Sequence, residues 1–257
     1  MERGAVIDPD LAACGRRNVA HTYVELSRTV PGAKVERHYG FIAVTAPISL
    51  SFCNFALDFD LRDRDPARVM AALRQTMDGK EAFRAFHIPV QEDDPTADIL
   101  VSAGWRRQHT LAQMAWRPES TTTDVHLYPC THPAERLEIA VFMVEQFFWR
   151  QSSAMRQAIL DATIASSHEI YRVGSGDSIE AAVMASRLPD SLGLYNLCVR
   201  RNLRGRGLGG RVVKAIQALA AEANLPVVLQ CEATLEDWYA YHGMKIVGIV
   251  ESYALFR

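Results

Sequence analysis

A basic, glycine-rich turn is the part of this sequence best suited to chemistry. It runs from Cys198 to Arg211 (CVRRNLRGRGLGGR) and follows the apolar run Leu194–Val199, which predicts a strand. Glycines let a backbone turn tightly and approach a ligand without interference from Cβ atoms. Between Ser191 and Ala221 the sequence has six basic residues and no acidic one. Because N–H groups at the start of a helix also attract negative charge, the turn predicts a phosphorylated ligand.

Two nucleotide-binding motifs are alternatives for this turn. A P-loop needs a lysine and a hydroxyl residue directly after its last glycine, and Arg211 and Val212 stand there instead, so ATP is excluded. A dinucleotide fingerprint is matched by the spacing of Gly205, Gly207 and Gly210, with Glu232 placed where a ribose-binding acid would lie. That fingerprint follows its strand directly, however, and only about 50 residues remain for the rest of a doubly wound sheet. An NAD-binding domain is therefore a distant third interpretation.

The turn resembles the acyl-CoA motif of the GNAT acyltransferase superfamily, R/Q-x-x-G-x-G/A after a strand that ends in valine. The match is carried by the segment Arg204–Gly209 (RGRGLG). A second segment, Trp238–Met244 (WYAYHGM), is similar to the family's F/L-Y-x-x-x-G-F, with its tryptophan and methionine as departures. The resemblance covers about residues 125–257. Residues 58–66 (DFDLRDRDP) occupy the equivalent place in the first half, where acidic residues would repel a pyrophosphate.

The resemblance implies an α/β (α+β) fold of two GNAT-like domains, each a mixed, mostly antiparallel twisted sheet flanked by helices. Residues 1–120 would be a degenerate domain without the acyl-CoA motif, and residues 121–257 the acetyl-CoA-binding domain. The implied activity is transfer of an acetyl group from acetyl-CoA, as cosubstrate and without a metal, to a small-molecule amine or peptide acceptor by direct attack on the thioester. The alternative is a non-catalytic acyl-CoA-binding or scaffold protein, since no strand carboxylate lies between Ser191 and Leu203.

The same resemblance assigns site residues. Tyr239 matches the tyrosine that protonates the departing CoA thiolate, a role that suits a phenol because it stays protonated at neutral pH. Asn196, Tyr195 and Glu232 remain open as candidates for the general base. The cofactor-binding positions form two runs, one on the strand and one in the turn: Leu197, Cys198, Val199, Arg204, Gly205, Arg206, Gly207, Leu208, Gly209 and Gly210.

Three weaker signals have ordinary explanations. Cys198 has no nearby histidine in sequence to activate it, so it is expected to be a strand residue and not a nucleophile. His126, Cys130 and His132 lack a fourth metal ligand and are expected to be loop and strand residues. For the aromatic run 147–149 (FFW), packing in the helix core and lining of an acceptor pocket remain equal alternatives.

These residues need elements to position them. In the first half, apolar periodicity and breakers predict helices at about Pro9–Arg28, Pro66–Met77 and Thr96–Ala103, and strands at Val35–Tyr39, Phe41–Ala46, Ser51–Phe59, Phe86–Val90 and Trp105–Trp116. In the second half they predict helices at Pro133–Arg150, Ala154–Ser166, after the glycine turn and at Leu235–Tyr241, with strands at Val125–Tyr128, Glu169–Val173, Ile179–Arg187, Leu194–Val199, Val227–Cys231 and within Lys245–Phe256.

Composition limits the class of protein. The chain has 257 residues, 49% hydrophobic content and a formal net charge of −2, which gives no reason to expect nucleic-acid or membrane partners. Its five cysteines are scattered and its first residues have no signal-peptide core, so we expect a cytoplasmic protein with reduced thiols. A homodimer is compatible with the sequence.

Overall fold

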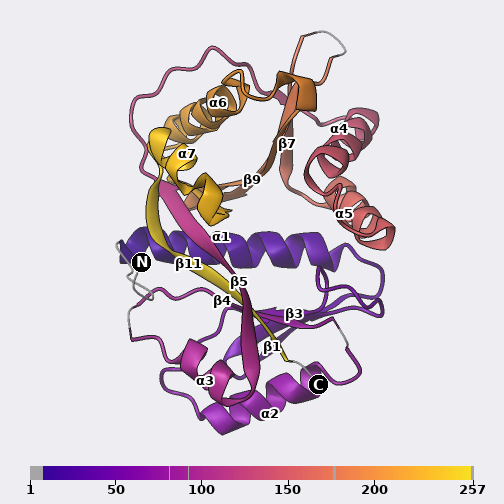
Figure 1. The fold of residues 1–257 in the computed structure, drawn as a ribbon, viewed down its shortest axis with the longest axis vertical. Coiled ribbons are helices and arrows are strands. Elements are labelled where there is room, and N and C mark those ends of the chain that lie inside the picture. The colour runs from indigo at the N-terminus through magenta and orange to yellow at the C-terminus, as the bar shows by residue number, and fades with distance from the viewer. Residues whose placement is uncertain (1–7, 81, 92, 176–177, 256–257) are drawn as a thin grey trace.

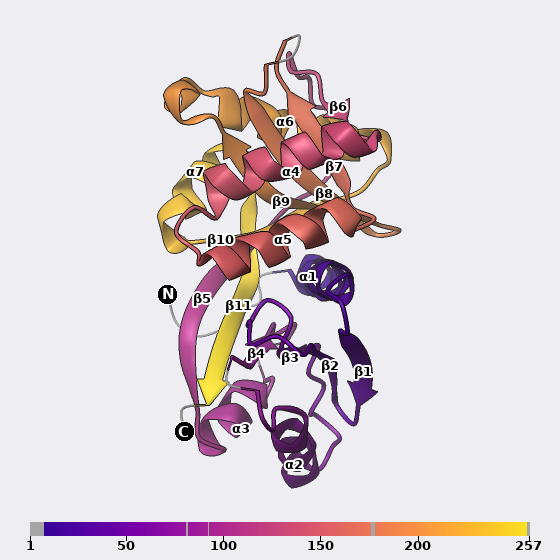
Figure 2. The ribbon, with the colours of Figure 1, turned by 90° about the vertical axis from the view of Figure 1, so that its right-hand side faces the viewer.

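The computed structural model describes residues 8–80, 82–91, 93–175 and 178–255. The expectation about a signal peptide concerns residues 1–7, which lie outside the described residues. In the described part, eleven strands form one sheet in the order β1-β2-β3-β4-β11-β5-β10-β9-β8-β7-β6. Helices lie on both sides of this sheet (Figure 1 and Figure 2). None of the helices within these ranges combines the length and the apolar character needed to cross a membrane.

The first half contains α1 (Pro9–Arg28), β1 (Lys34–His38), β2 (Phe41–Thr45), β3 (Phe55–Leu57), α2 (Pro66–Thr76), β4 (Arg84–His87), α3 (Thr96–Ser102) and β5 (Trp105–Trp116). The second half contains β6 (Tyr128–Pro129), α4 (Pro133–Phe147), α5 (Ser153–Ala165), β7 (Glu169–Val173), β8 (Ala181–Leu188), β9 (Ser191–Val199), α6 (Leu208–Glu222), β10 (Val227–Cys231), α7 (Glu236–Tyr241) and β11 (Lys245–Leu255). Two short 3-10 helices, η1 (Arg201–Leu203) and η2 (Ala233–Leu235), lie in the second half.

Local chemistry explains where α1 and α2 begin. Each has an aspartate at its N-cap and a proline at its first position. The Asp8 carboxylate accepts a hydrogen bond from Leu11 N at 3.2 Å, and the Asp65 carboxylate accepts one from Ala67 N at 2.9 Å. Such caps accept hydrogen bonds from N–H groups that have no acceptor within the helix. Proline has no N–H group, and at the first position of a helix that group would have had no intrahelical acceptor. The predicted starts of both helices are confirmed.

The strand predicted at Phe86–Val90 lies at Arg84–His87 as β4, and three other predicted strands differ more from the structure. The first is β3, which has three residues where a strand over Ser51–Phe59 was expected. The fully buried Asn54 explains this, because its side chain donates to the carbonyl oxygens of Ile48 (2.6 Å) and Leu50 (3.0 Å) and thereby fixes a loop. The others are β6, which has two residues, and β11, which is one long strand with two register shifts.

The strand directions agree with the predicted mixed, mostly antiparallel arrangement. Only two of the described neighbouring pairs are parallel, β3 with β4 and β9 with β10. All the other pairs are antiparallel. The fold class is therefore confirmed.

The two halves do not keep separate sheets, because they exchange their last strands. In the second half, β11 pairs with β4 through Glu251–Tyr253 and with β5 along its length. In the first half, β5 pairs with β10 through Ala112–Trp116. Figure 1 shows β5 and β11 running side by side from one half into the other. The expectation of one sheet for each half is corrected in this respect, and the boundary at residue 120 stays a prediction.

The exchange makes a truncation informative. We expect a fragment of residues 121–257 to lack a cooperative thermal transition, because it loses β5, the antiparallel partner of both β10 and β11. It also loses Met114 and Trp116 from the main hydrophobic cluster of the second half. Circular dichroism during heating measures this, and co-expression with residues 1–120 is the control that should restore the transition. A fragment that melts cooperatively alone would contradict the expectation.

A buried ionic network holds the exchanged strands together. Glu251 on β11 accepts hydrogen bonds from Arg107 on β5 (2.7 Å) and from the hydroxyl of Tyr253 (2.8 Å). His87 on β4 lies between two carboxylates, with Nδ1 3.1 Å from Glu251 and Nε2 3.4 Å from Asp94. Burial by itself disfavours the charged forms, but the hydrogen bonds outweigh it. They lower the pKa of Glu251 and of Asp94 to about 2 and raise the pKa of His87.

We expect Glu251→Gln to lower the free energy of unfolding by about 3 kcal/mol, since the buried His87 loses the nearer of its two carboxylate partners and Arg107 loses its ion pair. The loss should be largest between about pH 4.5 and 6.5. Below that window the carboxylates of the unfolded chain are protonated, and stability falls toward the folded pKa values of about 2. Above it, the contribution of His87 is lost as pH rises through its raised pKa.

Urea unfolding of both proteins at pH 5.5 and pH 9 measures this effect. The control is Glu222→Gln, at an exposed position at the end of α6. An equal difference between wild type and Glu251→Gln at both pH values would rule out the titrating network.

Candidate functional site

The parallel strands β9 and β10 separate soon after they meet. Their pairing is limited to Leu192 and Gly193 on β9 opposite Val227 and Val228 on β10. Beyond this point β9 continues to Val199 while paired only with β8. Backbone groups on the other side of β9 are therefore free to bind a ligand as an added strand would.

A bulge lies in β9 within this unpaired segment. Asn196 has a left-handed backbone with φ of 51°, and the register with β8 shifts between Ala182 and Met184. Bulges bend a strand and redirect the groups that follow them. Here the bend directly precedes Leu197–Val199, the predicted pantetheine-binding residues.

The glycine turn connects β9 to α6 in the conformation that its sequence predicts. Gly205 and Gly207 have φ of 75° and 80°, which L side chains rarely adopt. A Cβ atom at either position would meet no atom within 4 Å, so the backbone there faces open space. Gly210 has a different reason to be glycine, because its Cβ would lie 2.3 Å from Cε1 of His242.

The N-terminus of α6 is an anion-binding geometry. No side chain caps it, and Gly207 is the N-cap. The first bond of the helix runs from Arg211 N to Gly207 O at 3.2 Å. The N–H groups of the residues between them are thus left without intrahelical acceptors, and the helix dipole adds partial positive charge at the same place.

The end of β9, the glycine turn, α7 and the end of α4 line a groove of about 660 Å³. Among the predicted site residues, all but Arg206 line it, and Arg206 is exposed. The structure thus brings Tyr239 and the predicted cofactor-binding residues together although they lie on separate elements. Four lining residues were not predicted as site residues, namely Gln146, Leu203, Leu235 and Trp238, while Phe147 belongs to the aromatic run expected in part at an acceptor pocket.

Arg204 joins two walls of this groove. Its Nε donates to Val199 O at 2.9 Å, and its Nη2 lies 3.4 Å from the carbonyl oxygen of Gln146 at the end of α4. The guanidinium therefore fixes the end of β9 against α4. Phe147, the next residue on α4, lines the groove with its side chain half exposed. Within the aromatic run 147–149, Phe147 is the residue that reaches the groove.

Tyr239 on α7 presents a buried phenol to the groove. The residue is 8% exposed, and its hydroxyl makes no hydrogen bond within the described ranges. Burial raises its pKa above the usual value of a tyrosine. The phenol therefore holds its proton at neutral pH and is available as a donor.

The three candidates for a general base lie outside the groove lining. Tyr195 donates its hydroxyl to Asn18 Oδ1 at 3.0 Å, and burial raises its pKa, so it serves packing against α1. Glu232 is exposed and lies 3.0 Å from Nε2 of His109, while Asn196 forms the bulge. Within the described chain, no aspartate, glutamate or histidine lines the groove.

The remaining sequence candidates take structural positions. Burial raises the pKa of Cys198 to about 12, which keeps its thiol protonated, and Sγ lies 3.7 Å from Ala182 O. His132 caps α4 by accepting from Ala134 N at 3.4 Å. His126 packs edge-on against Tyr128, and Cys130 lies in a hydrophobic cluster.

Solved structures of similar shape identify this architecture. No protein-family model matches the chain, and no curated protein matches it in sequence. A GCN5-related N-acetyltransferase from Kribbella flavida is 13% identical, with 93% of this chain and 94% of that chain covered and a TM-score of 0.67. One from Sphaerobacter thermophilus is 14% identical, with coverage of 97% and 94% and a TM-score of 0.57.

A tandem GNAT protein from the clavulanic acid biosynthesis pathway is 14% identical, with 87% of this chain and 83% of that chain covered and a TM-score of 0.57. At these identities the likeness shows the fold. The chain has the fold of the GCN5-related N-acetyltransferases, as the two sequence motifs predicted.

Proposed function

We propose, from the GNAT fold of this chain and the groove in its second half, that the protein is an acetyl-CoA-dependent N-acetyltransferase. One observation carries the proposal. The groove brings together the free edge of β9 at Leu197–Val199, the uncapped start of α6 and the phenol of Tyr239. These are a strand-like binding edge, an anion site and a proton donor, which together suit a thioester carried on a long phosphorylated arm.

The chain's own groups would hold the cosubstrate in two places. The N–H groups from Arg204 to Gly210 would bind the pyrophosphate, over the open space at Gly205 and Gly207. The free edge of Leu197–Val199 would bind the pantetheine arm, and one N–H there would donate to the thioester carbonyl oxygen. Acetyl-CoA, when bound, supplies the activated acetyl group.

Transfer of the acetyl group then requires two proton transfers. The departing sulfur gains a proton, and the amine nitrogen loses one. As the amine nitrogen bonds to the acetyl carbon and the carbon–sulfur bond breaks, Tyr239 donates its phenolic proton to the sulfur. Its raised pKa keeps that proton in place beforehand. The amine's surplus proton passes to water, because no carboxylate or imidazole lines the groove in the described chain. Tyr239 regains its proton from solvent.

The same observation supports a second candidate, a non-catalytic acyl-CoA-binding or scaffold protein. A groove without a lining carboxylate or imidazole can bind CoA while lacking an efficient path for the amine proton. The binding protein and the enzyme would bind the same ligand, CoA, but only the enzyme would transfer the acetyl group.

Two measurements test the proposal and separate the candidates. Isothermal titration with CoA should give saturable binding with one site per chain. A thiol-release assay with acetyl-CoA and a panel of small amines and peptides should then give acceptor-dependent release. Tight CoA binding without release would favour the binding protein, and absence of CoA binding would overturn both.

A further inference from the structure

A polar cavity lies in the first half, at the place that corresponds to the groove in the second. The strands β3 and β4 pair in parallel only at Phe55 and Ala56, as β9 and β10 do at their own start. A loop of residues 58–65 then joins β3 to α2, as the glycine turn joins β9 to α6. The cavity has a volume of about 360 Å³, and its charged lining consists of Arg16, Arg37, Asp58, Asp60, Arg62 and Arg64.

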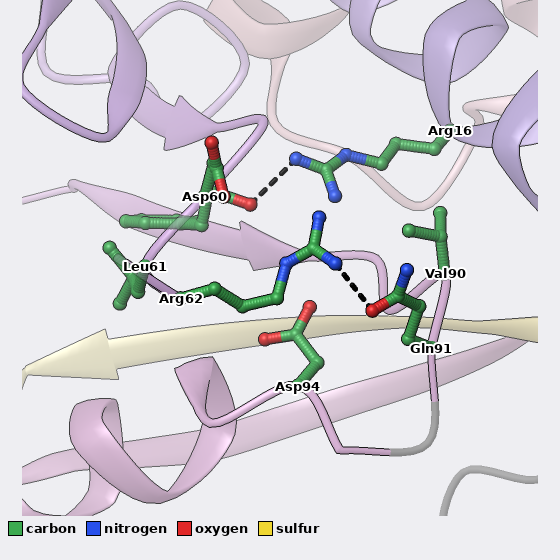
Figure 3. Close-up of a pocket in the computed structure, with 8 residues that line it drawn as sticks. Arg16, Asp60, Leu61, Arg62, Val90, Gln91 and Asp94 are labelled. Atoms are coloured by element: carbon green, nitrogen blue, oxygen red, sulfur yellow. Dashed lines mark hydrogen bonds between the residues drawn. The ribbon is translucent and has the colours of Figure 1, made fainter. Parts of the chain in front are cut away.

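The four arginines come from three separate segments. Arg16 lies on α1, Arg37 on β1, and Arg62 and Arg64 in the loop before α2. An adjoining small cavity shares Arg16, Asp60 and Arg62. Figure 3 shows the guanidinium groups of Arg16 and Arg62 extending toward one another there, one from the helix and one from the loop. We name the larger space the arginine cavity.

The acidic residues of the loop do not make this cavity negative. The Asp58 carboxylate accepts from Arg16 Nε at 2.9 Å, and Asp60 lies 3.6 Å from Arg64. Arg62 donates to the side-chain oxygen of Gln91, which is a neutral partner. Arg37 has no carboxylate partner within the described part of the chain. Two of the four arginines thus form no ion pair with a carboxylate among the described residues.

The loop has one buried donor without a partner and packs closely against the turn between β1 and β2. Nε of Arg64 is buried and has no hydrogen-bond acceptor among the described residues, which is rare for a buried donor. Gly40 has φ of 97°, and a Cβ atom there would lie 3.0 Å from Cδ of Arg64 and 3.2 Å from Asp60 O. The glycine therefore lets the loop close onto the turn between β1 and β2.

Asp58 has a left-handed backbone at the same place, with φ of 58°, a conformation that asparagine and aspartate adopt more readily than other residues with a side chain. Arg16 stabilises this conformation through two hydrogen bonds. Its Nε donates to the Asp58 carboxylate, and its Nη2 donates to Phe59 O at 2.6 Å.

We propose that the arginine cavity binds a small molecule with two or more negative charges on phosphate or carboxylate groups. Guanidinium groups match both kinds of oxyanion through paired N–H donors. The volume fits a small metabolite, at the lower end of the range for ligand pockets. The site is independent of the groove, since none of its charged residues lines the groove.

Titration calorimetry with inorganic phosphate and with citrate, at constant ionic strength, tests the proposal. We expect saturable binding to wild type and a dissociation constant at least about tenfold higher for Arg62→Gln. The matched control is Arg74→Gln, which removes an arginine from the exposed face of α2 in the same half. It should bind as wild type does.

Comparing variants separates this site from the glycine turn, because any phosphate bound at the turn contributes equally to all three proteins. Arg37→Gln, at an exposed position on β1, should weaken binding in the same direction and serves if Arg62→Gln does not fold. Tighter binding of phosphate identifies a phosphate monoester as the ligand class, and tighter binding of citrate identifies a polycarboxylate. Binding that is absent in wild type, or unchanged in both cavity variants, would overturn the proposal, whatever happens with CoA.

Discussion

Replacing Tyr239 with phenylalanine is expected to lower the rate of acetyl transfer roughly 100-fold or more. The affinity for CoA should stay within about twofold of wild type, because the hydroxyl acts on the departing sulfur and makes no hydrogen bond with the described protein. The ring is buried, and phenylalanine preserves its packing. Steady-state assays for kcat and calorimetry for CoA measure the two quantities separately.

Tyr241→Phe is the matched control, since Tyr241 lies on the same short helix with its side chain almost fully exposed and outside the groove. It should leave both quantities unchanged. Because burial raises the pKa of Tyr239, wild-type kcat should show no alkaline loss near pH 10, where an ordinary tyrosine ionises. Equal kcat values for Tyr239→Phe and wild type would remove the phenol from the mechanism.

Replacing Gly207 with valine is expected to reduce CoA affinity by at least about 100-fold. The new side chain would project into open space beside the N–H groups of the turn, where the pyrophosphate is proposed to lie. A β-branched residue with φ of 80° would also distort the turn that aims those groups. Titration calorimetry with CoA measures the loss.

The control for backbone strain is Gly79→Val. Gly79 has φ of 71°, a Cβ atom there would also meet no atom within 4 Å, and the residue lies after α2, away from the groove. Both variants should lose similar stability, about 1–2 kcal/mol for a left-handed non-glycine residue. Only Gly207→Val should lose CoA affinity, and a parallel loss in both variants would assign the effect to folding.

Local sequence signals predicted most of the elements and most of the described residues that line the groove. Prolines preceded by aspartate marked the starts of α1 and α2, and two motifs located the turn and Tyr239. Each of these signals depends on neighbours within a few residues. Gln146 gave no such signal, because it reaches the groove through a contact with Arg204, which is distant in sequence.

Long-range features were missed for the same reason. The exchange of β5 and β11 is a choice of pairing partner, and apolar periodicity identifies a strand without naming its neighbours. The loop of residues 58–65 looked acidic because Arg16 and Arg37, which join its charges in the folded chain, lie far away in sequence. The net charge of a sequence segment therefore does not predict the charge of the cavity that the segment lines in the folded chain.

The exchange of strands also governs how this chain can fold as it is made. Chains of several domains usually fold each domain as it leaves the ribosome, starting from the N-terminus. Here β4 has β11 as its antiparallel partner, and β11 is the last of the described strands. It follows β4 by roughly 160 residues, so at about 5–20 residues per second the edge of β4 stays open for on the order of 10–30 s. The sheet therefore closes only after β11 has been synthesised, and until then the edge of β4 that β11 covers has no partner strand.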